Sequence, residues 1–242
     1  MAVSSTTKPL PAVYLAAGEG RRLRPLTDQL PKAMIEVGST SLAERALTSL
    51  RSAGVAKVVA VTGHCAKAFD AVGSLIDEQR FNSRFADAGN VYSLWCARDV
   101  VEHGCYIVNS DVLFEDEIAR RLVGLEDTAL LCSASHGVDE ESMKAVSEDG
   151  RLTRLSKAAP VDSNPEYIGL TRIDPADGPQ LAEILHRFVE RGLTDDYYEG
   201  AIEQLGGSRP VRVERVDGLA WIEIDDHEDL ARARSEVLEQ VS

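Results

Sequence analysis

Small residues and glycines end an apolar run near the N-terminus. Residues 13–16 have the pattern of a buried strand, and a loop with two glycines follows them. Because no Cβ stands in the way at glycines, backbone N–H groups can approach a phosphate chain closely. We therefore predict a phosphate-binding turn formed by Leu15, Ala16, Ala17, Gly18 and Gly20.

Basic residues follow this turn at short spacing. Arg22 is one of three arginines before Pro25, and Lys32 comes a few residues later. Guanidinium and ammonium groups supply fixed positive charge against a triphosphate. The dinucleotide-binding fingerprint is excluded because Leu23 stands where a third small residue is needed, and no Walker-type Gly-Lys-Ser/Thr follows. A solvated surface turn is the commoner meaning of two nearby glycines, but this combination of residues is too specific for it.

Two carboxylates follow apolar segments that are far apart in the sequence. Asp111 comes shortly after residues 106–108, and Asp225 follows residues 221–224. Mg²⁺ prefers a few hard oxygen ligands together with water and substrate phosphates. In an open α/β sheet, ligands also bind at the carboxyl ends of the strands. The pair therefore predicts a metal site, although a turn or a helix cap explains either aspartate taken alone.

The elements that must position these residues alternate between strand and helix patterns through the first half of the chain. This alternation predicts an α/β, Rossmann-like fold with a mixed, mostly parallel central sheet flanked by helices. The longest loop is expected at residues 156–165, which are rich in turn-forming residues. Predicted strands are 13–16, 58–61, 106–108, 129–133, 166–173 and 221–224, and predicted helices are 41–53, 66–76, 179–191, 195–205 and 227–239.

The composition limits the classes of protein. With 242 residues, 44% of them hydrophobic, the chain is long enough for a single domain over 1–242, with residues 1–10 as a disordered tail. The formal net charge of -14 argues against nucleic acid as a partner. No apolar stretch approaches the roughly 18 residues of a membrane span, so we expect no membrane contact and a cytoplasmic protein. The four cysteines lack metal-site spacing, which favours reduced thiols.

The segment LAAGEGRRLRPLTDQLPKAM closely resembles the signature of the nucleotidyltransferase superfamily that activates sugar phosphates, phosphocholine and phosphonates. VNSDVLF and WIEIDDHEDLARA resemble the two metal-binding segments of that superfamily and occur in the expected order. The resemblance implies that Lys32 and Arg22 hold the phosphates, with Arg22 at the departing pyrophosphate. It also implies that Asp111 and Asp225 bind Mg²⁺ and that Glu223 contacts a magnesium-bound water or the acceptor.

The middle of the chain is similar to the cytidylyltransferase branch that includes phosphocholine and aminoethylphosphonate cytidylyltransferases. The similar segments are NSRF and GNVYSL. By this resemblance Thr62, Gly63, Asn90 and Ser93 lie near the nucleotide base and the acceptor. Asn90 and Ser93 can offer hydrogen bonds to a cytosine edge, and a helix N-terminus explains these two residues equally well.

Other positions follow the family pattern less closely. Gly89 replaces the first of two adjacent asparagines, and His64 replaces the usual aromatic residue after Thr-Gly, which makes His64 a candidate acceptor contact. Lys144 and Lys157 match lysines that reach the phosphates in the family. A solvated lysine is an equally good interpretation of each.

The acceptor is expected beside an aromatic and acidic stretch that includes Tyr198 and Glu199. In the relatives this stretch lines the acceptor pocket, and aromatic faces with carboxylates suit a cationic head group. A strongly anionic acceptor would need arginines instead. Arg84 and Arg172 are the candidates for that role.

We therefore predict a Mg²⁺-dependent cytidylyltransferase that transfers CMP from CTP to a small phosphonate or phosphomonoester and releases pyrophosphate. Phosphonoformate, hydroxymethylphosphonate, aminoethylphosphonate and phosphocholine represent the acceptor classes considered. The arginine-rich, lysine-poor composition is typical of high-GC actinobacteria, in which such enzymes serve phosphonate antibiotic biosynthesis, including the phosphinothricin pathway. The alternatives are a sugar-1-phosphate nucleotidyltransferase and a non-catalytic nucleotide-sensing domain. The oligomeric state, a homodimer among the options, stays open.

Overall fold

The computed structural model describes residues 9–135, 137–161 and 164–241. Most of the predicted disordered tail, residues 1–8, therefore lies outside the described residues. Leu10 belongs to the described part, and its side chain packs partly buried against the hydrophobic core.

The centre of the molecule is a mixed sheet, nine-stranded within the described residues, in the order β5-β4-β1-β6-β11-β8-β12-β10-β9. Pairing is parallel among β5, β4, β1 and β6 and between β8 and β12, whereas β11 runs antiparallel to β6 and β8. The sheet is thus mixed, as predicted, and most of its parallel pairing lies in the N-terminal half. The strands are β1 Ala12–Ala16, β4 Val58–Thr62, β5 Glu78–Phe81, β6 Cys105–Asn109, β8 Ala129–Ser133, β9 Lys144–Glu148, β10 Arg151–Ser156, β11 Glu166–Ile173 and β12 Arg212–Arg215.

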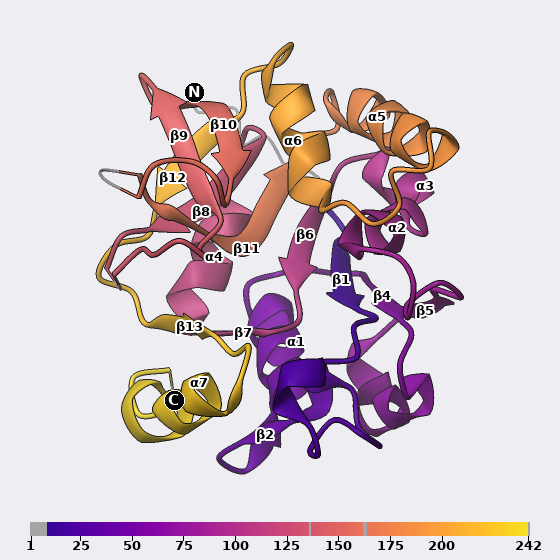
Figure 1. The fold of residues 1–242 in the computed structure, drawn as a ribbon, viewed down its shortest axis with the longest axis vertical. Helices are drawn as coiled ribbons and strands as arrows, with labels where there is room; N and C mark the ends of the chain where they lie inside the picture. The colour runs from indigo at the N-terminus through magenta and orange to yellow at the C-terminus, as the bar shows by residue number, and fades with distance from the viewer. Residues whose placement is uncertain (1–8, 136, 162–163, 242) are drawn as a thin grey trace, which may run out of the picture.

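Helices cover both faces of this sheet (Figure 1). Side chains of β1 alternate between two apolar cores: Tyr14 packs with α1 and α4, and Leu15 packs with α2, α5 and α6. This alternation follows from the two-residue repeat of a strand that is buried on both sides. The helices are α1 Leu42–Ser52, α2 Asn90–Trp95, α3 Arg98–Val101, α4 Asp116–Gly124, α5 Gly178–Glu190, α6 Tyr198–Gly206 and α7 His227–Arg232.

A small two-stranded sheet joins the middle of the chain to its C-terminal end. β7 (Val112–Phe114) pairs antiparallel with β13 (Trp221–Glu223), so the segments just outside these strands lie side by side. Figure 1 shows this pairing beside α7. A third apolar cluster, which includes Leu113, Ile222 and Leu230, packs α7 beneath it. A further short pair is formed by β2 (Glu36–Val37) and β3 (Thr40–Ser41).

Several predicted elements are shorter or different in kind. Residues 66–76 form 3₁₀ turns from Ala66 to Leu75 with a break at Val72, instead of a continuous helix. The predicted helix 195–205 begins only at Tyr198, and α7 passes into a π-helical turn, Ala233–Val237. The described part of residues 156–165 after β10 is a loop, as predicted.

Two further features concern the cysteines and the apolar character of the helices. The four cysteines are unpaired, and Cys105 and Cys132 are buried, so burial raises the pKa of both thiols. Across the described segments, no helix combines the length and the apolar character needed to cross a bilayer.

The close contact between α5 and α3 gives a test of the packing. A Cβ added at Gly178, the first residue of α5, would lie 2.6 Å from the Glu102 carbonyl oxygen, whereas one added at Gly124 would meet no atom within 4 Å. Gly178→Ala should therefore lower the free energy of unfolding by about 1–3 kcal/mol. Gly124→Ala should leave it unchanged or raise it by about 0.4–1 kcal/mol. Urea unfolding measures both, and equal stabilities of the two variants would contradict the packing described.

Candidate active site

β1 delivers the glycine turn at its carboxyl end. Gly20 has a φ of 61°, in the left-handed region, and an added Cβ would lie 3.0 Å from Lys32 Cβ. Thr27 Oγ1 donates to the Gly20 carbonyl oxygen at 2.8 Å. An added Cβ at Gly18 would meet no atom within 4 Å, so the space in front of this residue is open. The turn therefore brings Lys32 to the strand end and leaves Gly18 accessible to a ligand.

A cavity of about 160 Å³ opens beside this turn. Backbone and small side chains form one wall, and the start of α2 forms another. We call it the turn cavity. Among its lining residues are Leu15, Ala16, Ala17, Gly18, Asn90 and Ser93.

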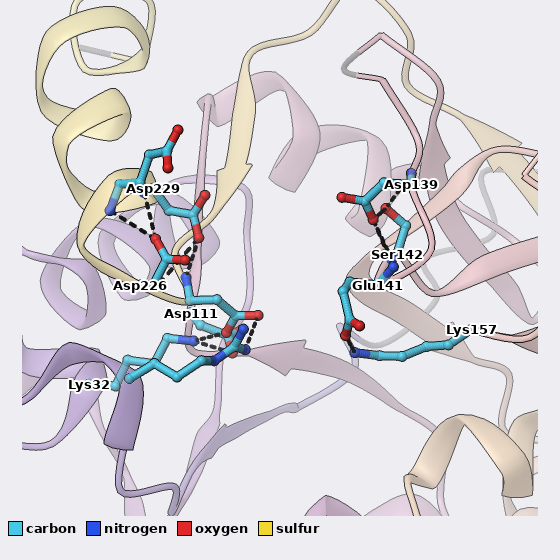
Figure 2. Close-up of polar contacts among 11 residues, drawn as sticks. Lys32, Asp111, Asp139, Glu141, Ser142, Lys157, Asp226 and Asp229 are labelled. Atoms are coloured by element: carbon cyan, nitrogen blue, oxygen red, sulfur yellow. Dashed lines mark hydrogen bonds and ion pairs between the residues drawn. The ribbon is translucent and has the colours of Figure 1, made fainter.

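Lys32 lies between two aspartates that come from distant parts of the chain, and Figure 2 shows it beside one of them, Asp111. Its Nζ donates to Asp225 Oδ1 at 2.6 Å and to Asp111 Oδ2 at 3.0 Å. An Arg22 guanidinium nitrogen lies 2.6 Å from Asp225 Oδ2. The aspartates meet because β7 pairs with β13, and Ile224 N donates to the Asp111 carbonyl oxygen at 2.9 Å just beyond that pairing.

Neighbouring charges and burial together shift the pKa values of the side chains in this cluster. Burial lowers the pKa of Lys32, but Asp111 and Asp225 outweigh burial and raise this pKa above its ordinary value. Burial raises the pKa of Asp225, and Lys32 together with Arg22 outweighs that effect and lowers it. Burial and the neighbouring Asp111 and Asp225 raise the pKa of Glu223 well above its ordinary value. Lys32 and Asp225 are therefore held in their charged forms.

Three carboxylates of the cluster fit a divalent metal. One oxygen from each of Asp111, Glu223 and Asp225 lies within 4.8 Å of the others. Within the described residues, Asp111 Oδ1 is buried and has no hydrogen-bonding partner. A buried oxygen without a partner is costly, and hard oxygen atoms are the ligands that Mg²⁺ prefers. The donor set therefore fits Mg²⁺.

A second cavity of about 200 Å³ adjoins Asp111, and we call it the tail cavity. Glu141 and Lys157 line it, with Lys157 Nζ 3.5 Å from Glu141 Oε2 and 5.8 Å from the centre of the Tyr197 ring. Figure 2 shows the Glu141–Lys157 pair on the side opposite Lys32 and Asp111. The charged cluster thus lies between the turn cavity and the tail cavity.

Asn90 and Ser93 line the turn cavity, but their polar atoms have partners within the protein. Asn90 Oδ1 accepts from Tyr198 N at 2.7 Å, and its Nδ2 donates to Glu199 Oε2 at 3.4 Å. Ser93 Oγ accepts from Asn82 Nδ2 at 3.0 Å. Asn90 is the first residue of α2. Both side chains therefore tie α2 to neighbouring segments.

Thr62, Gly63 and His64 support the glycine turn from behind. His64 N donates to the Ala17 carbonyl oxygen at 3.1 Å, and His64 Nε2 lies 2.7 Å from the Thr27 carbonyl oxygen. A Cβ at Gly63 would lie 2.7 Å from the Ala17 carbonyl oxygen, so the turn needs glycine there. Thr62 is buried at the end of β4. The proposed acceptor contact of His64 gains no support, because its ring faces the turn.

Lys144 and Lys157 occupy different environments. Lys144 is fully buried, and its Nζ donates to the carbonyl oxygens of Asp139, Ser142 and Glu140 at 2.7, 3.0 and 3.2 Å. The expectation that Lys144 reaches the nucleotide phosphates is corrected here, because its ammonium is enclosed by this loop. Lys157 lines the tail cavity.

Tyr198 and Glu199, at the start of α6, also differ in position. Tyr198 is fully buried, and its hydroxyl lies 2.7 Å from the Tyr167 hydroxyl, beneath the tail cavity. Tyr197 takes the cavity-facing place expected of Tyr198. Glu199 lines the cavity, and burial raises its pKa to about 7.

The two arginines considered for an anionic acceptor lie outside the described linings of both cavities. Arg84 pairs with Asp87 at 3.1 Å on the surface and lies 5.3 Å from the Tyr92 ring centre. Arg172, buried on β11, pairs with Asp174 at 3.0 Å. The cations that do line the tail cavity are Arg22 and Lys157.

Several residues that line the tail cavity were not predicted as site residues from the sequence, among them Asn109, Glu141 and Tyr197. Asn109 carried a usable signal, because it precedes Asp111 by two residues at the same strand end. Tyr197 is adjacent to Tyr198, and only the position at which α6 starts decides which ring faces the cavity. Glu141 lies in a loop without a sequence signal.

Comparisons with known proteins identify the family and the fold. The model of the MobA-like NTP transferase domain family matches residues 12–159. The choline-phosphate cytidylyltransferase of Streptococcus pneumoniae is 25% identical over 228 residues, covering 90% of this chain and 94% of that protein. The 2-aminoethylphosphonate cytidylyltransferase of Lancefieldella rimae is 23% identical over 229 residues, covering 91% and 90%. A bifunctional IPC transferase and DIPP synthase of Aquifex aeolicus is 26% identical over 231 residues, and the match covers 92% of this chain but only 50% of that protein.

A solved structure shows the same fold. The CTP:phosphocholine cytidylyltransferase from Streptococcus pneumoniae superposes with a TM-score of 0.81 at 22% sequence identity, covering 93% of this chain and 98% of that one. The predicted α/β fold with a central sheet flanked by helices is therefore confirmed. The family match, residues 12–159, includes the glycine turn, Lys32 and Asp111. The chain belongs to the family of MobA-like NTP transferase domains and is a nucleotidyltransferase.

Proposed function

We propose that this protein transfers CMP from CTP to a small phosphonate or phosphomonoester, with Mg²⁺ as cofactor, and releases pyrophosphate. The observation that carries the proposal is the Lys32 ammonium, held by Asp111 and Asp225 between two cavities and beside a glycine turn. Fixed charges of this kind stabilise phosphoryl groups whose charge changes during reaction. Relatives named as cytidylyltransferases support CTP as the nucleotide.

In the proposed reaction, the acceptor's phosphoryl or phosphonyl oxygen attacks the α-phosphorus of CTP. This oxygen is ionised at neutral pH, so it needs positioning more than a general base. The bond from the α-phosphorus to the bridging oxygen breaks, and its electron pair leaves with pyrophosphate. Lys32 neutralises charge at the reacting phosphoryl group, and Arg22 neutralises the departing pyrophosphate. Mg²⁺ held by Asp111, Asp225 and Glu223 would supply Lewis-acid neutralisation of phosphate charge.

The tail cavity is the proposed place for the rest of the acceptor. The Lys157 ammonium already lies over the Tyr197 ring, so this part of the cavity accommodates a cation. The carboxylates of Glu141 and Glu199 line the same space. These features favour an acceptor with a cationic end, such as phosphocholine or an aminoalkylphosphonate. Lys157 is the tail-cavity cation that remains available to an acceptor with a second anionic group, because Arg22 is assigned to the pyrophosphate.

The first prediction is that pyrophosphate release requires CTP, Mg²⁺ and one acceptor from the proposed classes. Purified protein is offered phosphocholine, 2-aminoethylphosphonate, hydroxymethylphosphonate, phosphonoformate and glucose 1-phosphate, each with CTP, UTP, dTTP or GTP. We expect release with CTP and a phosphonate or phosphomonoester. Release only with a sugar 1-phosphate would replace the proposal by a sugar-1-phosphate nucleotidyltransferase. Nucleotide binding without any release would indicate a sensing domain.

The second prediction concerns Lys32. Lys32→Ala removes one preorganised charge and should lower kcat by about a hundredfold or more. Lys67→Ala is the matched control, because Lys67 is exposed and lies outside the described cavity linings. Circular dichroism and thermal unfolding establish that both variants are folded. Wild-type kcat in a folded Lys32→Ala variant would exclude this lysine from the reaction.

The third prediction uses the pKa of Glu199, which burial raises to about 7. Glu199 gains its negative charge as the pH rises through this value, and the charge attracts a cationic acceptor. For a choline or aminoalkyl acceptor, the ratio of kcat/KM between wild type and Glu199→Gln should therefore increase from pH 6 to pH 8. Ionisation of the acceptor's own phosphoryl group affects both proteins and cancels in the ratio. A ratio independent of pH would remove Glu199 from acceptor recognition.

A further inference from the structure

Three residues line both the turn cavity and the tail cavity, namely Asn90, Asn109 and Asp111. A group transferred from one cavity to the other must pass these side chains. Asn109 is the last residue of β6, and its Cα is paired with that of Leu15 near the end of β1. It therefore lies at the carboxyl end of the parallel strands, directly beside the glycine turn.

Two of these three side chains are already engaged. Both polar atoms of Asn90 have partners in α6, and Asp111 Oδ2 accepts from Lys32. Asn109 differs from Asn90, because only its Oδ1 has a partner, the Tyr198 hydroxyl at 2.9 Å, and it differs from Asp111, because its second polar atom is a donor. Within the described part of the chain, the Asn109 Nδ2 amide has no hydrogen-bonding partner. The boundary between the cavities thus offers one unused neutral donor.

The orientation of this amide is fixed from two sides. Tyr198 donates to Asn109 Oδ1, and the Tyr198 hydroxyl in turn lies 2.7 Å from that of Tyr167, which lies 2.7 Å from Thr171 Oγ1. Burial raises the pKa of Tyr198 well above its ordinary value, so this phenol keeps its proton. Since the phenol occupies the amide oxygen, the amide nitrogen is held on the other side.

Gly169 shows where that nitrogen is held. A Cβ added at Gly169 would lie 2.9 Å from Asn109 Nδ2 and 2.9 Å from Asn109 Cβ, and Gly169 has a φ of 80°. Gly169 lines the tail cavity but is not among the residues lining the turn cavity. The absence of a side chain at Gly169 leaves the amide nitrogen uncovered on the tail-cavity side.

We infer that Asn109 Nδ2 donates a hydrogen bond to the acceptor's phosphoryl or phosphonyl group and aligns it for attack, an assignment that rests on the proposed function. Asn109 is then a catalytic residue, and Tyr198 is the positioning residue that orients its amide. An amide donor suits an anionic oxygen and adds no charge beside Lys32, whose ammonium neutralises the neighbouring carboxylates.

Steady-state kinetics with the acceptor selected by the panel tests this inference. Asn109→Ala should lower kcat/KM for the acceptor by about 10- to 100-fold, as expected for a hydrogen bond to a charged group. The KM for CTP should stay within about twofold. Asn109→Asp keeps the shape and the acceptor atom for Tyr198 but places a negative charge beside the anionic acceptor, so it should be worse than Asn109→Ala.

A double-mutant cycle separates this role from general stabilisation of the fold. Tyr198→Phe should reduce acceptor kcat/KM less than Asn109→Ala does, and the double variant should resemble Asn109→Ala alone, because the phenol acts only through the amide. Tyr106→Phe is the matched control. Tyr106 lies on β6, as Asn109 does, but its hydroxyl donates to the Val123 carbonyl oxygen instead of to the Asn109 amide. Additive effects, equal losses for CTP and acceptor, or wild-type kinetics of Asn109→Ala would overturn the inference.

A binding measurement keeps the inference distinct from the proposed reaction. Methylphosphonate is titrated into protein saturated with Mg²⁺ and the non-reactive α,β-methylene analogue of CTP. Asn109→Ala should weaken methylphosphonate binding at least tenfold and leave binding of the nucleotide analogue unchanged. Unchanged methylphosphonate binding would exclude the hydrogen bond even if turnover is observed. If wild type binds neither probe, both the proposed function and the inference fail.

Discussion

Repulsion among carboxylates is the constraint on which this site depends. Oxygen atoms of Asp111, Glu223 and Asp225 lie within 4.8 Å of one another in a partly buried place, where like charges repel more strongly than in water. Lys32 and Arg22 offset this repulsion. Because Lys32 is separated by 79 residues from Asp111 and by 193 from Asp225, the same contacts hold the N-terminal turn, the end of β6 and the C-terminal segment together.

The sequence predicted the elements that are buried on both faces and missed those at the edges. β1, β4 and β8 are continuous apolar runs, which is the pattern of a covered parallel strand, and all were predicted. The strands at the two edges, β5 and β9, carry exposed polar residues, so their sequences resemble loops, and the same holds for β10 beside β9. The antiparallel pairing of β11 with β6 and β8 arises from long-range register, which no local pattern encodes.

The same distinction applies to the site. The predicted site residues meet in the structure, namely Arg22, Lys32, Asp111 and Asp225. They could be predicted because a glycine turn and the end of a strand can be recognised in the local sequence. The position of the Lys144 ammonium could not be predicted, because it depends on how a neighbouring loop folds. Three carbonyl oxygens of that loop enclose the ammonium. The lining of the tail cavity likewise depends on which ring of the pair Tyr197 and Tyr198 faces it. Side-chain direction of this kind follows from packing and not from residue type.

β6 pairs in parallel with β1 on one side and antiparallel with β11 on the other. This change of strand direction also lies between the regions that form the two cavities. Most walls of the turn cavity come from the ends of β1 and β6 and from residues 85–93, which follow β5 and include the start of α2. Apart from the residues that the two cavities share, the tail cavity adds residues of β11 and α6 together with Glu141 and Lys157. On the proposed assignment, donor and acceptor are thus held by different stretches of chain. Substitutions in the C-terminal half can then change the acceptor specificity, while the N-terminal half continues to bind the triphosphate.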